Sequence, residues 1–208
     1  MRRRAELKED AKEQLRGKRG TGALITLILF IIALIPSIVG YFVESEVIVG
    51  ILDIVVQIYV TLLGIGCLLY YFAVRRNEEV SVGMLFSGCK YYLKGFCIVF
   101  LSGVMMFFGF ILFIIPGIIL SLMYSQALYI YIDEPEKGII ECLRTSRLAM
   151  KGYKGDLFVL NLSFIGWGIL CALTLGLLAL YVTPYFGTTL VNFYTDLMED
   201  YRGKEITL

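Results

Sequence analysis

Long apolar stretches separated by short charged segments are the dominant pattern along this chain. Residues 23–43 and 47–74 are almost wholly apolar, and only a Glu-Ser-Glu segment lies between them. Residues 96–132 and 157–198 are also mostly apolar, but each stretch is much longer than one membrane crossing. Since a helix needs about 20 apolar residues to cross the hydrocarbon core of a bilayer, the pattern predicts several transmembrane helices.

Turn signals divide the two longer stretches. Pro116 and Gly117 interrupt the third stretch, because proline removes a backbone donor and glycine permits a positive φ angle. Gly176, at the end of a Thr-Leu-Gly segment, marks a turn in the fourth. We therefore predict an all-α, polytopic transmembrane protein, with six helices arranged as three helical hairpins linked by amphipathic cytoplasmic segments. The chain forms a single integral membrane domain over 1–208, and its predicted spans are about 23–43, 47–74, 96–115, 118–132, 157–174 and 177–198.

The distribution of charge gives the predicted orientation. With six spans, all 19 lysine and arginine residues fall on one side, in residues 1–22, 75–95, 133–156 and the C-terminal tail. Because cytoplasmic loops are enriched in these residues, we expect a multi-pass protein of the cell membrane with both termini in the cytoplasm. A five-span alternative, in which 177–198 lies on the membrane surface, would place Arg202 and Lys204 outside.

Two of the segments between spans carry apolar residues at helical spacing, which predicts amphipathic surface helices. Their apolar stripes are formed by Val82, Leu85, Phe86, Cys89, Leu93 and Phe96 in the first, and by Ile139, Leu143, Ser146, Met150 and Tyr153 in the second. Such a stripe can lie in the lipid headgroup layer, pack against the cytoplasmic ends of the spans, or dock a partner. The sequence leaves these alternatives open.

A short element of the form small–base–x–x–apolar–base–Gly occurs three times, each time just before an apolar stretch. Its copies are AKEQLRG, CKYYLKG and SRLAMKG. Bases four residues apart share one helix face and can reach lipid phosphates, and a glycine can end the surface helix. The alternative is that juxtamembrane segments are simply rich in lysine and glycine. The predicted contacts with the anionic inner leaflet are made by Lys12, Arg16, Lys90, Lys94, Arg147 and Lys151, and the predicted turns by Gly17, Gly95 and Gly152.

Residues that could carry out chemistry are few. The chain has no histidine, and its five cysteines include no C-x-x-C pair, so we expect no metal site and no cofactor. Without a recognisable nucleophile and base, no catalytic residue and no enzymatic activity are expected. The candidates for an intramembrane polar site are Asp53, Gln57 and Asn161. Asp53 and Gln57 either lie at the outer interface or belong to an ion or proton pathway, and Asn161 either bonds between helices or joins that pathway.

Small and aromatic residues of the last apolar stretch predict helix packing. Gly168, Ala172 and Gly176 are spaced four apart, which allows helix backbones to approach closely. Trp167 would lie near the middle of its span, away from the aromatic belt at the interface, and is therefore expected to face other helices.

Residues 112–170 and 173–194 resemble the domain-of-unknown-function 975 (DUF975) family of polytopic bacterial membrane proteins. The IPGI segment and the S-R-x-x-x-K-G element are more distantly similar to a membrane domain found beside some glycerophosphodiester phosphodiesterases. The family resemblance implies a membrane protein without an established activity, and no catalytic residue follows from it.

The expected function is therefore a non-enzymatic accessory, scaffold or lipid-contacting component. Its expected partners are anionic lipids of the inner leaflet and another membrane protein, and the balanced charge of 19 bases and 18 acids argues against nucleic acid. A small solute transporter or channel is the alternative, because transporter sites often form where helical repeats meet. A lipid-directed enzyme is supported only by the more distant resemblance.

Overall fold

The described part of the chain is helical and contains no β-strand. The structure is a computed structural model, which describes residues 2–43, 45–87 and 91–206. The helices are α1 (Arg4–Gln14), α2 (Arg19–Phe42), α3 (Glu46–Arg75), α4 (Met84–Ser87), α5 (Tyr92–Leu112), α6 (Ile114–Tyr124), α7 (Ala127–Asp133), α8 (Ile139–Ala149), α9 (Lys154–Leu162), α10 (Ile165–Leu173) and α11 (Ala179–Ile206). This confirms the all-α prediction.

Five helices of the described chain are long and apolar enough to cross a membrane. They are Arg19–Phe42, Glu46–Arg75, Tyr92–Leu112, Ile114–Asp133 and Lys154–Leu173, the last two being the pairs α6–α7 and α9–α10. Large apolar side chains of these helices are exposed, among them Phe30, Ile54, Phe107 and Ile169. Apolar surface of this extent is typical of a protein embedded in lipid. The predicted sixth span, 177–198, falls mostly on α11, which does not belong to this group, so the six-span arrangement stays a prediction.

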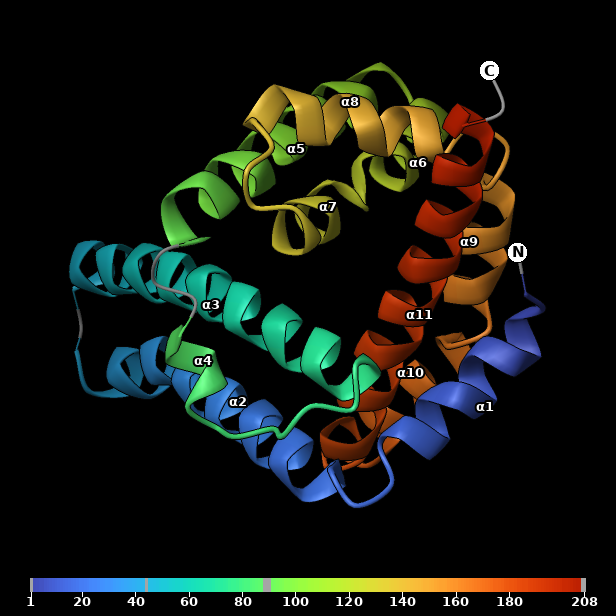
Figure 1. Cartoon of the computed structure of the whole chain (residues 1–208). Helices are drawn as coiled ribbons and strands as arrows, with labels where there is room; N and C mark the ends of the chain where they lie inside the picture. The colour runs from blue at the N-terminus through green and yellow to red at the C-terminus, as the bar shows by residue number, and fades with distance from the viewer. Residues whose placement is uncertain (1, 44, 88–90, 207–208) are drawn as a thin grey trace.

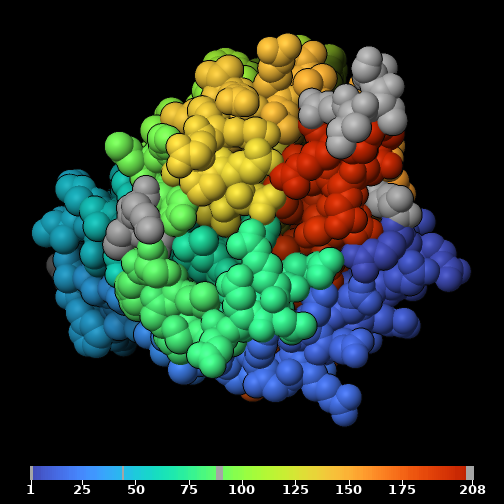
Figure 2. Space-filling view, in the orientation of Figure 1, coloured from blue at the N-terminus to red at the C-terminus, as the bar shows by residue number. Residues whose placement is uncertain are grey.

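The helix α11 is the most enclosed long helix of the protein. It packs against α1, α2, α3, α8 and α10, and Figure 1 shows α1 running alongside it. Its buried polar residues, Thr188, Thr189, Asn192 and Asp196, explain this position, because polar groups in a membrane protein are costly unless protein surrounds them. One side of its C-terminal part reaches the surface between α8 and α1 (Figure 2).

The third apolar stretch breaks at Phe113, three residues earlier than predicted. Phe113 is extended, with φ −167° and ψ 159°, and caps α6. Pro116 and Gly117 therefore lie in the first turn of α6 and not between spans. Proline is tolerated there because the first N–H groups of a helix have no intrahelical acceptor. The amide of Gly117 makes the first such bond, donating to the Phe113 carbonyl at 3.2 Å.

Gly117 has a packing role instead of a turn role. A Cβ atom at this position would lie 2.4 Å from Cδ1 of Phe110 on α5. The absence of a side chain is thus what lets α5 and α6 approach each other closely.

Two spans that the sequence presents as continuous are each broken near a serine. The α6–α7 break contains Ser125, whose hydroxyl donates to the Leu122 carbonyl at 2.9 Å. The α9–α10 break contains Ser163, whose hydroxyl donates to the Leu160 carbonyl at 2.5 Å. Serine side chains that bond to the preceding turn compete with the backbone and bend helices, so the local breaks have a sequence cause.

The two predicted surface helices differ in outcome. In α8, the apolar stripe packs against α5, α6, α7 and α11, with Cys142 and Met150 fully buried. The neighbouring helices therefore cover the apolar stripe of α8, although Ile140 remains exposed. Of the predicted stripe over residues 82–96, Leu85 and Phe86 lie on the four-residue α4 and Leu93 and Phe96 lie at the start of α5, whereas Cys89 lies outside the described residues.

Candidate functional site

The N-terminal helix α1 packs lengthwise on α11. Leu7, Ala11 and Leu15 lie on one face of α1 because they are four residues apart, and all three are buried. The Asn192 side-chain amide on α11 donates to the Leu7 carbonyl at 3.3 Å. We call this contact the α1–α11 seam, and it covers the apolar face of the basic N-terminal segment with protein.

An ion pair closes one end of the α1–α11 seam. The Arg2 Nε atom lies 3.0 Å from both carboxylate oxygens of Asp196, a side chain that is only 5% exposed. The hydrogen bonds to Asp196 raise the pKa of Arg2 above its ordinary value, against the opposing effect of burial. Arg2 also pairs with Asp10 on α1. A buried carboxylate needs such partners, since removing one leaves an uncompensated charge.

Basic side chains along the α1–α11 seam face aromatic rings. The Lys8 ammonium lies 4.4 Å from the centre of the Phe164 ring. Further along, Lys12 lies 5.7 Å from Tyr185, and the Arg19 guanidinium lies 5.6 Å from Tyr181. Cations in this position are attracted by the ring face. Burial, and then the nearby charge of Lys12, lower the pKa of Lys8 below its ordinary value.

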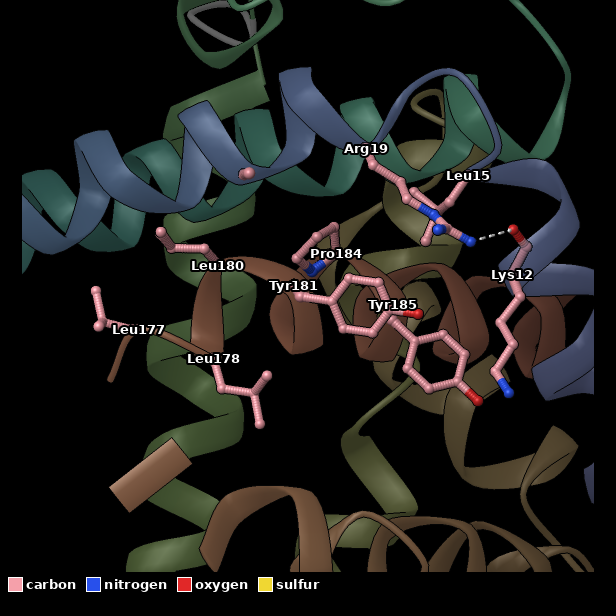
Figure 3. A pocket seen from close by; sticks show the side chains of 10 residues that line it. Lys12, Leu15, Arg19, Leu177, Leu178, Leu180, Tyr181, Pro184 and Tyr185 are labelled. Atoms are coloured by element: carbon pink, nitrogen blue, oxygen red, sulfur yellow. Dashed lines mark hydrogen bonds between the residues drawn. The ribbon is translucent and has the colours of Figure 1, made fainter. Parts of the chain in front are cut away.

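An apolar pocket opens at the other end of the α1–α11 seam (Figure 3). Its volume is about 180 Å³. It lies between the end of α1, the start of α2 and the start of α11, and its lining residues are Lys12, Leu15, Arg19, Ala23, Leu177, Leu178, Leu180, Tyr181, Pro184 and Tyr185. This combination of an apolar interior and a basic rim makes it the candidate binding site of the protein.

A second polar cluster joins the ends of α3 and α7 to α11 around Asp133, the last residue of α7. The Asp133 carboxylate accepts hydrogen bonds from Arg76 at 3.0 Å, from Arg202 at 3.3 Å and from the Tyr194 hydroxyl at 3.0 Å. The neighbouring Glu134 accepts from Arg202 at 2.5 Å. Although burial acts to raise the pKa of Glu134, hydrogen bonds from Arg202 and then from a nearby lysine hold it below its usual value. We call this group the Asp133 junction.

The start of α9 is attached to the same part of α11. The Tyr153 hydroxyl donates to Asp200 at 2.6 Å, and the Lys204 ammonium donates to the Tyr153 hydroxyl at 3.1 Å. The hydrogen bonds from Lys204 and Tyr153 lower the pKa of Asp200. The last turns of α11 therefore contact chain segments that are far apart in the sequence.

The first and third copies of the repeated element have the same local structure. In each, the small and apolar positions are buried, the bases are exposed, and the final glycine has a positive φ angle, +84° at Gly17 and +95° at Gly152. A positive φ ends the preceding helix at little steric cost only for glycine. The buried positions are Ala11, Leu15, Ser146 and Met150, and the exposed bases are Lys12, Arg16, Arg147 and Lys151.

The second copy does not fit this pattern. Gly95 lies inside α5 with an ordinary helical backbone, and a Cβ atom there would approach Cδ1 of Ile65 to 2.7 Å. The prediction that Gly95 forms a turn is therefore wrong, and the residue instead permits close packing of α5 on α3. Lys94 is exposed, while Lys90 lies outside the described residues. The short pattern could not distinguish a helix end from a helix interior.

The predicted intramembrane polar residues are not brought together. Asp53 and Gln57 lie on the exposed side of α3, and Asp53 lines an open hollow between α2 and α3. Asn161 lies on α9, where its side-chain oxygen is buried without a hydrogen-bond partner. Among the described residues, no hydrogen bond joins these three side chains.

The packing predictions for the last apolar stretch had mixed outcomes. Gly168 and Ala172 are exposed, and a Cβ atom at Gly168 would meet nothing within 4 Å, so their predicted close packing is wrong. Gly176 has a φ of +85° and forms the turn before α11. Trp167 faces other helices as predicted, with its ring 6.4 Å from Tyr181 and 6.5 Å from Tyr185.

Sequence reasoning missed the aromatic and basic partners of the α1–α11 seam. The available signal was the four-residue spacing of Leu7, Ala11 and Leu15, which marks an amphipathic α1. Tyr181 and Tyr185 are also four apart and share a helix face. That these two faces meet is a tertiary contact, which neither spacing reveals alone.

Comparison with known proteins identifies the family. The model of the family described as "Protein of unknown function (DUF975)" matches residues 1–116 and 104–200. No curated protein and no solved structure matches the chain. Because the family model covers nearly the whole sequence, the match confirms the resemblance noted above, and the chain belongs to the DUF975 family.

Proposed function

We propose that the protein is a non-enzymatic membrane scaffold that contacts lipids and membrane-protein partners through its apolar surface. The observation that carries this proposal is the set of contacts around the end of α11. Between Tyr194 and Lys204, about 15 Å of helix, α11 binds the end of α7 and the start of α9 through hydrogen bonds. In the same part of α11, the Tyr194 ring contacts Phe72 near the end of α3, with ring centres 5.5 Å apart. A helix that fastens the ends of several others fits a structural role.

The same contacts support the proposed topology. Arg2 and Arg76 are both attached to this end of the protein, so the chain between them leaves and returns through α2 and α3. Arg76 binds Asp133 directly, which implies a second return through α5–α7. Tyr153 binds Asp200, which implies a third through α9–α11. The proposed return through α11 runs mostly among protein, because α11 packs against α1, α2 and α3.

We assign this face to the cytoplasm because it carries the basic segments. A reporter that is active only outside the cell is expected to be silent after Glu79, Gly138 or Gly203, and active when inserted at Ser45. Activity after Gly203 would establish an odd number of crossings and contradict both the return through α11 and the cytoplasmic C-terminus.

A small transporter is the second candidate, favoured by the open hollow between α2 and α3, which Asp53 lines together with Glu46, Ser37 and small or apolar residues. The scaffold proposal expects liposomes containing the purified protein to conduct protons, potassium and sodium no faster than empty liposomes. A flux that Asp53→Asn abolishes would overturn the scaffold proposal. Because Asp53 is exposed, this substitution is expected to leave the fold intact, which a thermal unfolding measurement checks.

A further inference from the structure

We propose that the pocket at the end of the α1–α11 seam binds one anionic phospholipid, with its phosphate at Lys12 and Arg19 and an acyl chain among the leucines. This inference rests on the proposed lipid-contacting function and specifies a site for it. Figure 3 shows Leu177, Leu178 and Leu180 on one side of the pocket, Lys12 and Arg19 with Leu15 on the other, and the tyrosine rings between them. The pocket thus has separate apolar and cationic ends.

The cationic end is open to an anion. Lys12 and Arg19 are exposed, and among the described residues neither lies within salt-bridge distance of a carboxylate. The one hydrogen bond that joins them runs from the Arg19 guanidinium to the Lys12 carbonyl at 3.5 Å, which brings the two residues together. The Lys12 ammonium and the Arg19 guanidinium lie over neighbouring rings, Tyr185 and Tyr181, whose centres are 6.3 Å apart. Groups of both kinds bind phosphate through charge-assisted hydrogen bonds.

The apolar end continues into the lipid-facing surface. Leu15 and Pro184 are buried at the base of the pocket, whereas Leu177 on its rim is 74% exposed. The neighbouring Leu175 and, on α2, Leu24 are also exposed. An acyl chain can therefore enter sideways from the hydrocarbon layer while its headgroup stays at the basic rim. A free anion would leave this apolar surface uncovered, and for that reason we assign the pocket to a phospholipid.

The tyrosines set the position of the bases. Tyr185 and Tyr181 hold Lys12 and Arg19 over their ring faces, at 5.7 and 5.6 Å. This arrangement limits the freedom of two long side chains before the lipid binds, which reduces the entropy that binding would otherwise cost. Arg16, although basic and exposed, does not line the pocket.

The test uses the full-length protein in detergent and its one tryptophan, Trp167, which lies close to both tyrosines. Short-chain phosphatidylglycerol is titrated while Trp167 emission is recorded, and phosphatidylcholine with the same chains is titrated separately. We expect a saturable change with phosphatidylglycerol and an apparent affinity about thirtyfold lower for phosphatidylcholine, since two bases that each favour an anionic lipid by roughly 1 kcal/mol together contribute about this factor. Equal affinities would overturn the proposal.

Substitutions then locate the binding. Lys12→Gln combined with Arg19→Gln is expected to weaken phosphatidylglycerol binding about tenfold or more and to remove the preference. The matched control, Lys94→Gln with Lys151→Gln, removes two exposed bases elsewhere and should leave the affinity unchanged. If both double variants lose the same affinity, general surface charge is responsible and the site is refuted.

Two further arms distinguish the source of the anion. Inorganic phosphate and decanoate should compete only at concentrations far above those of the lipid; equally tight binding of either would overturn the phospholipid assignment. Ala23→Leu, which narrows the pocket without touching its bases, should weaken the binding of both lipids, and an unchanged affinity would refute the acyl-chain position. A failed reporter experiment would remove the scaffold topology, whereas unchanged lipid affinities in every variant would remove this site alone.

Discussion

Gly66→Ala is expected to lower the free energy of unfolding by about 3 kcal/mol, because the added methyl group has no room. Gly66 lies on α3 where the helix passes under α4, and its Cβ atom would fall 2.2 Å from the carbonyl oxygen of Leu85. That oxygen already accepts a hydrogen bond from the Tyr92 hydroxyl at 2.9 Å. Since the obstacle is backbone and not the end of a flexible side chain, α4 would have to move and the hydrogen bond would be strained. Equilibrium unfolding in mixed micelles, followed by circular dichroism, measures the effect.

Gly64→Ala is the matched control on the same helix. A Cβ atom at Gly64 would meet nothing within 4 Å, and the residue is exposed. Replacing a helical glycine with alanine at such a position should stabilise the protein by up to about 1 kcal/mol. The opposite signs of the two changes separate a packing effect from a general effect of helix propensity. Equal stabilities for the two variants would show that α4 does not lie against Gly66.

Asp133→Ala is expected to lower the free energy of unfolding by about 2 kcal/mol, through loss of the hydrogen bonds of the Asp133 junction. The carboxylate side chain is 21% exposed and binds Arg76 and Arg202, which remain partly solvated without it. Tyr194 is different, because it is only 1% exposed and its hydroxyl would lose its acceptor. Most of the expected loss therefore comes from the tyrosine. Unfolding measurements on the single variants and on a double variant with Tyr194→Phe will test this.

In that cycle, the double variant should be about 1 kcal/mol more stable than the sum of the single effects predicts, because the two side chains form one interaction. Glu136→Ala removes an exposed acid three residues away and should change stability by less than about 0.5 kcal/mol. Additive single effects, or an equal loss from Glu136→Ala, would mean that the hydroxyl of Tyr194 does not depend on Asp133.

Hydropathy alone was enough to predict most of the helices. Residues 23–43 and 47–74 correspond closely to α2 and α3, because a continuous apolar run of this length has one stable conformation in lipid. The positions of the breaks between helices were harder to predict from the sequence. Pro116 suggested a turn, but the turn falls at Phe113, since proline is as acceptable in the first turn of a helix as between two helices.

The role of α11 depends on contacts that no local pattern contains. Residues 177–198 read as a span because they are mostly apolar, yet Asn192 and Asp196 are buried against Leu7 and Arg2 at the other end of the sequence. The pairing of acids with bases at the Asp133 junction is equally non-local. Sequence reasoning could place each residue on a helix but could not select its partner.

The pairing of α1 with α11 also constrains biogenesis. Arg2 and Asp196 are 194 residues apart, so a ribosome completes nearly the whole chain before the surface that covers α1 exists. Until α11 has been synthesised, Leu7 and Leu15 lack the neighbours that bury them in the folded protein, and the apolar face of α1 stays uncovered. Native packing of α1 therefore follows the synthesis of α11. A premature stop before Asp196 would therefore leave the apolar face of α1 uncovered, although the truncation lies at the opposite end of the sequence. Such a chain should be recognised by cellular quality control.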